Sequence, residues 1–174
     1  MKFGKKIINK WHIDPEIAFL NHGSYGACPI SVLQKQNEIR ERMEKQPCRF
    51  LGREVWEGLV EESLEKAGSF VSASGKDMAF VDNATTGANS VLRSLEFKPG
   101  DELVTTSHVY GAVRATMDFV ALNSGAIVKE AIVPFPAKSE NEIVDSIESA
   151  LTSKTRFLLI DHIASASATI FPVK

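Results

Sequence analysis

Apolar and polar positions between residues 78 and 161 predict short strands that alternate with helices. Runs at residues 78–81, 102–106, 126–133 and 156–161 are typical of buried strands. Between them, apolar residues recur at helical spacing in three segments, which are 88–95, 113–121 and 143–151. Alternation of this kind predicts an α/β fold, with a mostly parallel sheet between helices in a three-layer α/β/α arrangement.

The first part of the chain has a different pattern. A short extended piece and a glycine-rich loop cover residues 13–29, and amphipathic helices are predicted at 30–44 and 55–71. Pro47 ends the first of these helices, because the residue before a proline is pushed out of the helical region. The pattern therefore divides the chain into three parts: an amino-terminal arm and loop (1–28), a pair of helices (29–72) and an α/β part (73–174).

The loop Asp82-Asn83-Ala84-Thr85-Thr86-Gly87 lies between a predicted strand and a predicted helix. Small residues permit close approach of a ligand, and the first turn of a helix offers free N–H groups that favour an anion. The loop is therefore a candidate phosphate cradle. An ordinary connection, in which Thr85 or Thr86 only caps the helix, accounts for the same residues.

Polar side chains follow the predicted strands at 82–87, 107–111 and 161–167. Because the carboxyl ends of parallel strands meet at one edge of a sheet, these loops are expected to share a site. The site would contain Thr85, Thr86, His108, Tyr110, Asp161, His162 and Ser165. No GxGxxG follows a strand and no GxxxxGK[ST] is present, which disfavours a dinucleotide and excludes a P-loop. The histidines do not have metal-ligand spacing, so no metal site is predicted.

Composition narrows the class of partner. With 22 acidic and 20 basic residues in 174, the chain has no field that would attract nucleic acid or an anionic membrane. No apolar run approaches the roughly 20 residues of a bilayer span, and the amino terminus lacks the pattern of a signal peptide. A cytoplasmic protein is therefore expected. Cys28 and Cys48 are isolated thiols, too few for a disulfide framework.

Four segments in order, FLNHGSYGACP, VDNATTGAN, SHVYGAV and DHIASASATIFPV, together resemble the class V aminotransferase family of fold-type I pyridoxal-phosphate enzymes. The likeness is to the isopenicillin N epimerase-like and cysteine desulfhydrase-like branch, and it covers the amino-terminal part of the large domain, over about residues 13–174. It implies pyridoxal 5′-phosphate as cofactor and an amino acid as substrate. The implied cofactor-binding residues are Thr85, Thr86 and Gly87 at the phosphate, Tyr110 stacked on the pyridine, and Ser165 and His162 beside them.

The resemblance also implies that Asn21, His22 and Gly23 lie near the substrate, and it leaves His108 as a lesser candidate for stacking. The chemistry implied is that of an electron sink, which permits reaction at the α- or β-carbon of an amino acid. An epimerase, an aminotransferase and a desulfhydrase or other lyase all remain open. In the family pattern the Schiff-base lysine and the small domain come after the last matching segment, and Lys174 does not match that lysine. We therefore expect no catalytic residue in these 174 residues, and weak or no cofactor binding by them alone.

Alternatives outside catalysis stay open. A non-catalytic remnant or a phosphate-ligand-binding α/β module would retain the sheet and the cradle, and an unrelated α/β phosphate-binding protein would hold another phosphorylated ligand.

A parallel sheet with an unpaired edge tends to associate. A homodimer or higher assembly is therefore expected.

Overall fold

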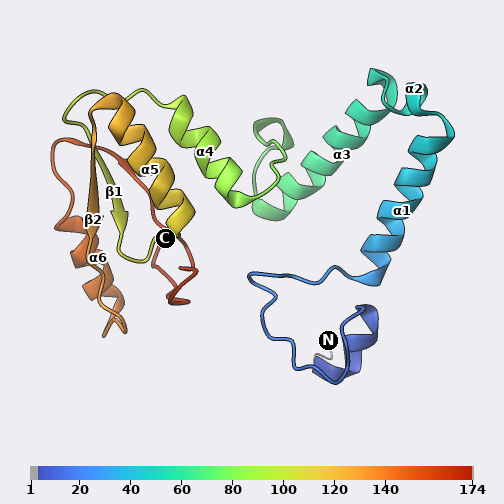
Figure 1. Cartoon of the computed structure of the whole chain (residues 1–174), viewed down its shortest axis with the longest axis horizontal. Coiled ribbons are helices and arrows are strands. Elements are labelled where there is room, and N and C mark those ends of the chain that lie inside the picture. The colour runs from blue at the N-terminus through green and yellow to red at the C-terminus, as the bar shows by residue number, and fades with distance from the viewer. Residues whose placement is uncertain (1–3, 174) are drawn as a thin grey trace. The chain divides into compact units, whose positions relative to one another are not determined.

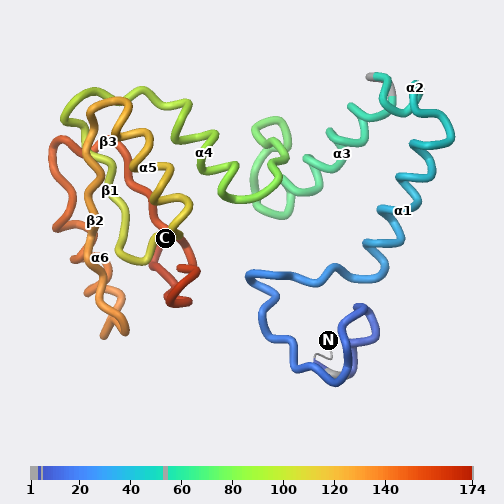
Figure 2. The backbone as a smooth tube through the Cα atoms, viewed as in Figure 1, coloured from blue at the N-terminus to red at the C-terminus, as the bar shows by residue number. Residues whose placement is uncertain are grey.

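A parallel sheet organises the second half of the chain (Figures 1 and 2). The structure, a computed structural model, describes residues 4–173. Strand β1 (Glu102–Thr106) is central and pairs in parallel with β2 (Ile127–Ala131) and β3 (Thr155–Leu158). The predicted strand at 102–106 is confirmed, and the two later ones are shorter than predicted.

Helices cover both faces of this sheet. Side chains alternate between the two faces of a sheet along each strand, so residues three positions apart point to opposite faces. In β2 and in the segment that contains β3, such residues belong to two different apolar clusters. One cluster joins β1 to α4 (Ala84–Ser94) and α5 (Gly111–Ser124), and the other lies against α6 (Glu140–Glu148). The first contains Leu92, Leu103, Met117 and Val120, and the second contains Ala131, Val133, Ile143, Ile147, Ala164 and Phe171. The three-layer α/β/α prediction is confirmed.

Some sequence predictions are wrong in detail. Residues 78–81 do not form a strand, because no strand among the described residues pairs with their backbone groups. Phe80 and Val81 are 62% and 49% exposed. Helix α6 ends at Glu148, so Leu151 lies beyond it and is 38% exposed. Strand β3 has a paired neighbour on one side only among the described residues, and Leu158 is partly exposed there instead of buried.

The amino-terminal half forms its own unit, Met1–Ala79, distinct from Phe80–Lys174. It contains the 3₁₀ helices η1 (Gly4–Lys10) and η2 (Gly75–Asp77) and the α-helices α1 (Ile30–Lys45), α2 (Pro47–Phe50) and α3 (Arg53–Val71). Both long helices were predicted, and α1 does end just before Pro47, which starts α2. Among described residues of this unit, the one buried large apolar side chain is Phe50.

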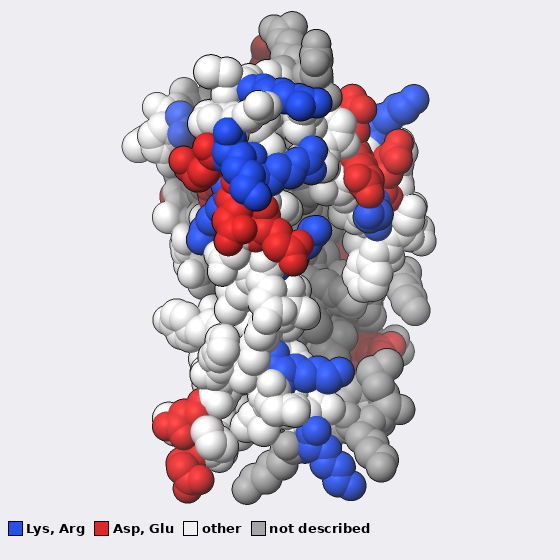
Figure 3. Space-filling view, turned by 90° about the vertical axis from the view of Figure 1, so that its right-hand side faces the viewer, with Lys and Arg blue, Asp and Glu red and all other residues white. Residues whose placement is uncertain are grey.

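The charged side chains are mixed in sign over the face shown in Figure 3, with acidic and basic groups next to one another. This distribution agrees with the near-neutral composition and gives no broad surface of one sign on that face. In the part of the chain that the structure describes, no helix has both the length and the apolar character needed to cross a bilayer.

Candidate functional site

The first turn of α4 is held by Asn83. Its side-chain oxygen accepts hydrogen bonds from the Thr86 N–H at 2.8 Å and from the Thr86 hydroxyl at 3.2 Å. The N-cap is therefore Asn83, and the assignment of Thr85 or Thr86 to this role was wrong, although Asn83 had the preferred residue type for it. Among the described residues, the Ala84 and Thr85 N–H groups have no acceptor, so they remain available to an anion.

Asn89 ties this turn to the neighbouring helix. Its amide nitrogen donates to the Thr85 carbonyl at 3.0 Å and to the Thr116 hydroxyl of α5 at 2.8 Å. Thr116 is buried and Asn89 is partly buried, so the link lies between the two helices and is partly shielded from water. The pattern of apolar residues gave no signal for this bridge, because its partners are 27 positions apart.

Tyr110 stands at the start of α5, with its side chain 49% exposed. Its backbone N–H donates to a carboxylate oxygen of Asp161 at 3.3 Å. The loops after β1 and β3 therefore meet at one edge of the sheet, as the parallel topology requires. The stacking role of Tyr110 stays a prediction.

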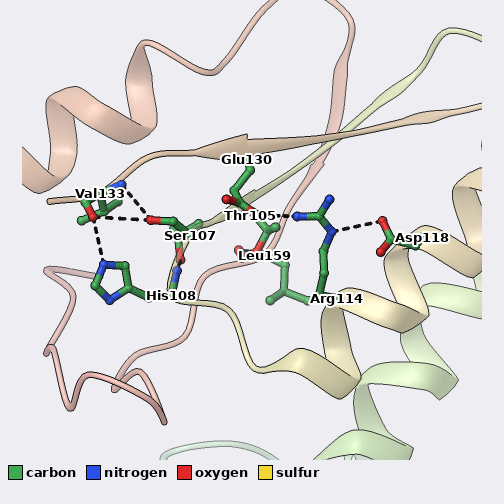
Figure 4. A network of polar contacts seen from close by, with 9 residues as sticks. Thr105, Ser107, His108, Arg114, Asp118, Glu130, Val133 and Leu159 are labelled. Carbon is green, nitrogen blue, oxygen red and sulfur yellow. Dashed lines mark hydrogen bonds and ion pairs between the residues drawn. The ribbon is translucent and has the colours of Figure 1, made fainter. Parts of the chain in front are cut away.

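His108 is turned inward from the same loop and is only 9% exposed. One ring nitrogen, Nε2, lies 2.9 Å from the Val133 carbonyl, and the other, Nδ1, lies 2.7 Å from the Ser167 hydroxyl (Figure 4 shows the Val133 contact). The ring also packs edge-on against Phe135 and Phe171. Both nitrogens are thus occupied in joining three loops, which leaves His108 unsuited to stacking on a ligand.

His162 and Ser165 lie in a small hairpin that comes after β3. The Phe171 N–H donates to the His162 carbonyl, and Ile163 and Ile170 form an antiparallel bridge. Both predicted site residues have exposed side chains, and within the described structure neither side chain has a hydrogen-bond partner. The serine that joins the loops is Ser167, which sequence reasoning missed.

The predicted substrate-side residues lie in the other unit. Asn21 accepts the Ser24 N–H at 3.3 Å in a tight turn that also includes Gly23. His22 packs edge-on against Phe19, at 4.7 Å between ring centroids, and borders a mainly apolar cavity of about 420 Å³ formed with η1 and residues 11–20. Their role in substrate binding stays a prediction.

Charged side chains on and beside the sheet are paired with one another. Hydrogen bonding from Thr152 lowers the pKa of Glu102, and the Asp118 carboxylate raises the pKa of Arg114, which also pairs with Glu130 on β2 (Figure 4). Within residues 4–173, no group of three or more histidine, cysteine or acidic side chains is placed to hold a metal ion.

Comparison with known families decides the classification. The model of the aminotransferase class-V family matches residues 18–174. The chain belongs to this family. The match includes the Asp82–Gly87 loop, Tyr110 and the hairpin after β3, and it confirms the resemblance found in the sequence.

Curated members of the class-V family extend the comparison. A probable chloroplastic L-cysteine desulfhydrase of Arabidopsis thaliana is 34% identical over 94% of this chain and 37% of its own length. An isopenicillin N epimerase of Amycolatopsis lactamdurans is 28% identical over 92% of this chain and 40% of its own length. The chain thus spans about two fifths of the relatives that it matches.

Solved structures agree on the fold. The cystine C–S lyase C-DES, in complex with cysteine persulfide, matches 88% of this chain and 40% of its own chain with a TM-score of 0.82 at 18% identity. A mutant of C-DES with glycine covalently linked to its pyridoxal phosphate gives a TM-score of 0.81 over 95% of this chain and 43% of its own. This chain therefore shares the α/β fold of these two structures.

Proposed function

We propose that this chain is the part of a pyridoxal-phosphate enzyme that binds the phosphate of the cofactor. The enzyme would act at the α- or β-carbon of an amino acid. Relatives named as cysteine desulfhydrases and epimerases support this class of reaction. The observation that carries the proposal is the bridge from Asn89 to Thr85 and Thr116. It fixes the open N–H groups of α4 relative to α5, the helix that begins just after Tyr110.

The residues of this region fit a phosphate ester joined to an aromatic ring. Ala84 and Thr85 offer unpaired N–H donors, and the Thr85 hydroxyl has no partner among described residues. A phosphate bound there would gain charge-assisted hydrogen bonds and the favourable end of the helix dipole. Tyr110, half exposed, would cover the ring, and Ser165 and His162 would approach its polar edge. Pyridoxal phosphate, when bound, supplies the electron sink for the reaction.

In this proposal the residues of this chain bind and orient the cofactor and the substrate. Asp161 accepts the Tyr110 N–H and so holds the start of α5. The turn Asn21–Gly23 is assigned to the amino-acid substrate. The exposed apolar side chains of both units, such as Phe70 and Leu122, support a homodimer or higher assembly. A cytoplasmic location is likewise part of the proposal.

Binding of 4-deoxypyridoxine 5′-phosphate tests the cofactor assignment, because this analogue keeps the phosphate but lacks the aldehyde that reacts with lysines. Equilibrium dialysis is expected to show weak binding, in keeping with a chain that holds only part of the site, and this binding should disappear when the phosphate is removed. Thr85→Val, which deletes the hydroxyl and keeps the branched shape, is expected to weaken binding about ten-fold. Ser90→Ala on the same helix is the matched control. Equal affinity for the analogue with and without phosphate would contradict the proposal.

A further inference from the structure

A basic cavity of about 500 Å³ lies in the amino-terminal unit, far along the chain from the α4 loop. Three of its lining residues are cationic, and none of the described lining residues is acidic. They are Arg42, Lys45, Gln46, Arg49, Phe50 and Val55. We propose that this cavity binds a small multivalent oxyanion, such as a dicarboxylate or a phosphate ester.

The local fold brings the cations together. Arg42 and Lys45 are three residues apart on the last turn of α1, so they share one face. Pro47 starts the short helix α2, which carries Arg49 back toward the same cavity. The negative end of the α1 dipole offsets part of their repulsion while no ligand is bound.

The cations have no carboxylate partners among the described residues. In the described part of this unit, Lys35 pairs with Glu38 and Lys66 pairs with Glu62, but neither Arg42 nor Arg49 contacts a carboxylate. Arg114 in the other unit, by contrast, contacts two carboxylates. Two guanidinium groups and an ammonium group around one cavity match the planar, multiply charged shape of carboxylates and phosphates.

An aromatic floor makes the cavity a defined site. Phe50 is buried, and the guanidinium carbon of Arg42 lies 5.7 Å from the centre of its ring. This cation–π contact restrains Arg42 before any ligand arrives. Gln46 adds a neutral amide, and Val55 adds an apolar wall. The proposal does not rest on the proposed function, because no residue of the cofactor region takes part.

The test is a titration of the 174-residue chain with sodium phosphate and with citrate at ionic strength held constant by sodium chloride. Trp56, next to Val55, reports on the cavity by fluorescence in a Trp11→Phe background, and thermal unfolding gives a second readout. A saturable response is expected. Stronger binding of citrate would assign a carboxylate ligand, and stronger binding of phosphate would assign a phosphate ester.

Arg49→Gln is expected to weaken binding about ten-fold or more, because one bidentate partner is lost. Arg40→Gln, which removes the same charge from α1 outside the cavity, should bind as the unmodified chain does. Equal binding by the two variants would overturn the proposal, as would an equal response to sodium chloride alone. Thr85→Val should leave this binding unchanged, which separates it from the cofactor assignment.

Discussion

The Nδ1 atom of His108 lies 2.7 Å from the hydroxyl oxygen of Ser167, across 59 residues of sequence. The opposite nitrogen lies 2.9 Å from the Val133 carbonyl, which can only accept, so Nε2 carries a proton. In neutral His108, Nδ1 then accepts from Ser167, whose oxygen is 2.9 Å from the Thr169 hydroxyl. One buried ring thereby connects the loops that come after all three strands.

His108→Gln should destabilise the chain by about 1 kcal/mol, and His108→Leu by about 2–4 kcal/mol. Glutamine can still donate to the Val133 carbonyl but loses Ser167, whereas leucine loses both contacts. Urea unfolding measures both values. His162→Gln is the matched control, because the His162 side chain is exposed and makes no described hydrogen bond; its change should stay within about 0.5 kcal/mol. Equal effects at the two histidines would contradict this role for His108.

Substitution of Gly87 can distinguish an effect on folding stability from an effect on ligand affinity. A Cβ added there meets only the Val81 side chain, at 3.6 Å, which is an ordinary contact. Gly87→Ala should therefore keep or raise stability, by up to about 1 kcal/mol, since alanine is the better helix former. If this glycine allows close approach of a phosphate, affinity for 4-deoxypyridoxine 5′-phosphate should fall about ten-fold in the same variant. Unchanged affinity, measured by dialysis beside Ser90→Ala, would remove Gly87 from the cofactor site.

Residue types at nearby positions were enough to predict the elements that depend only on their neighbours in the sequence. The turn before β1, the end of α1 at Pro47 and the Ser139 cap of α6 depend on residue types at fixed offsets, and the structure shows each of them. Glu142 stands three residues after the Ser139 N-cap, which is the spacing of a capping box, but its carboxylate accepts the Lys138 N–H instead of the Ser139 N–H. The family and its cofactor were likewise predicted from four short segments.

Contacts between distant segments could not be predicted. Residues 78–81 have the composition of a strand, but a strand also needs a neighbour, and sequence pattern does not supply one. The same holds for the site: the parallel topology correctly placed the loops of Tyr110 and Asp161 together, yet it could not show that His108 turns inward to Ser167. Which serine faces the histidine depends on the hairpin geometry of residues 162–171.

Glu102 should make stability depend on pH in the acid range. Its carboxylate accepts the Thr152 hydroxyl at 2.6 Å and the Lys129 ammonium at 3.3 Å, and the Thr152 bond is the main cause of its lowered pKa. A lowered folded-state pKa contributes stability above the unfolded value of about 4.3, and this contribution is lost as the pH falls through the lower folded-state pKa. Thr152→Val removes the hydroxyl donor, so the free energy of unfolding should depend less steeply on pH in the acid range. Urea unfolding of both proteins between pH values of about 3 and 6 measures it, and parallel curves would exclude the linkage.

Three glycines of one unit allow strain and crowding to be measured apart. Gly125 ends α5 with φ +74°, and an added Cβ would lie 3.2 Å from Pro99. Gly125→Ala is therefore destabilised both by the unfavourable backbone angle and by the close contact. Gly100 has φ +87° with open space around it, and Gly111 has neither strain nor a close neighbour. Urea unfolding should rank the alanine variants accordingly, with losses of about 2 kcal/mol or more at Gly125, about 1 kcal/mol at Gly100 and close to zero at Gly111. A loss at Gly111 as large as that at Gly125 would mean that neither backbone angle nor Pro99 sets the order.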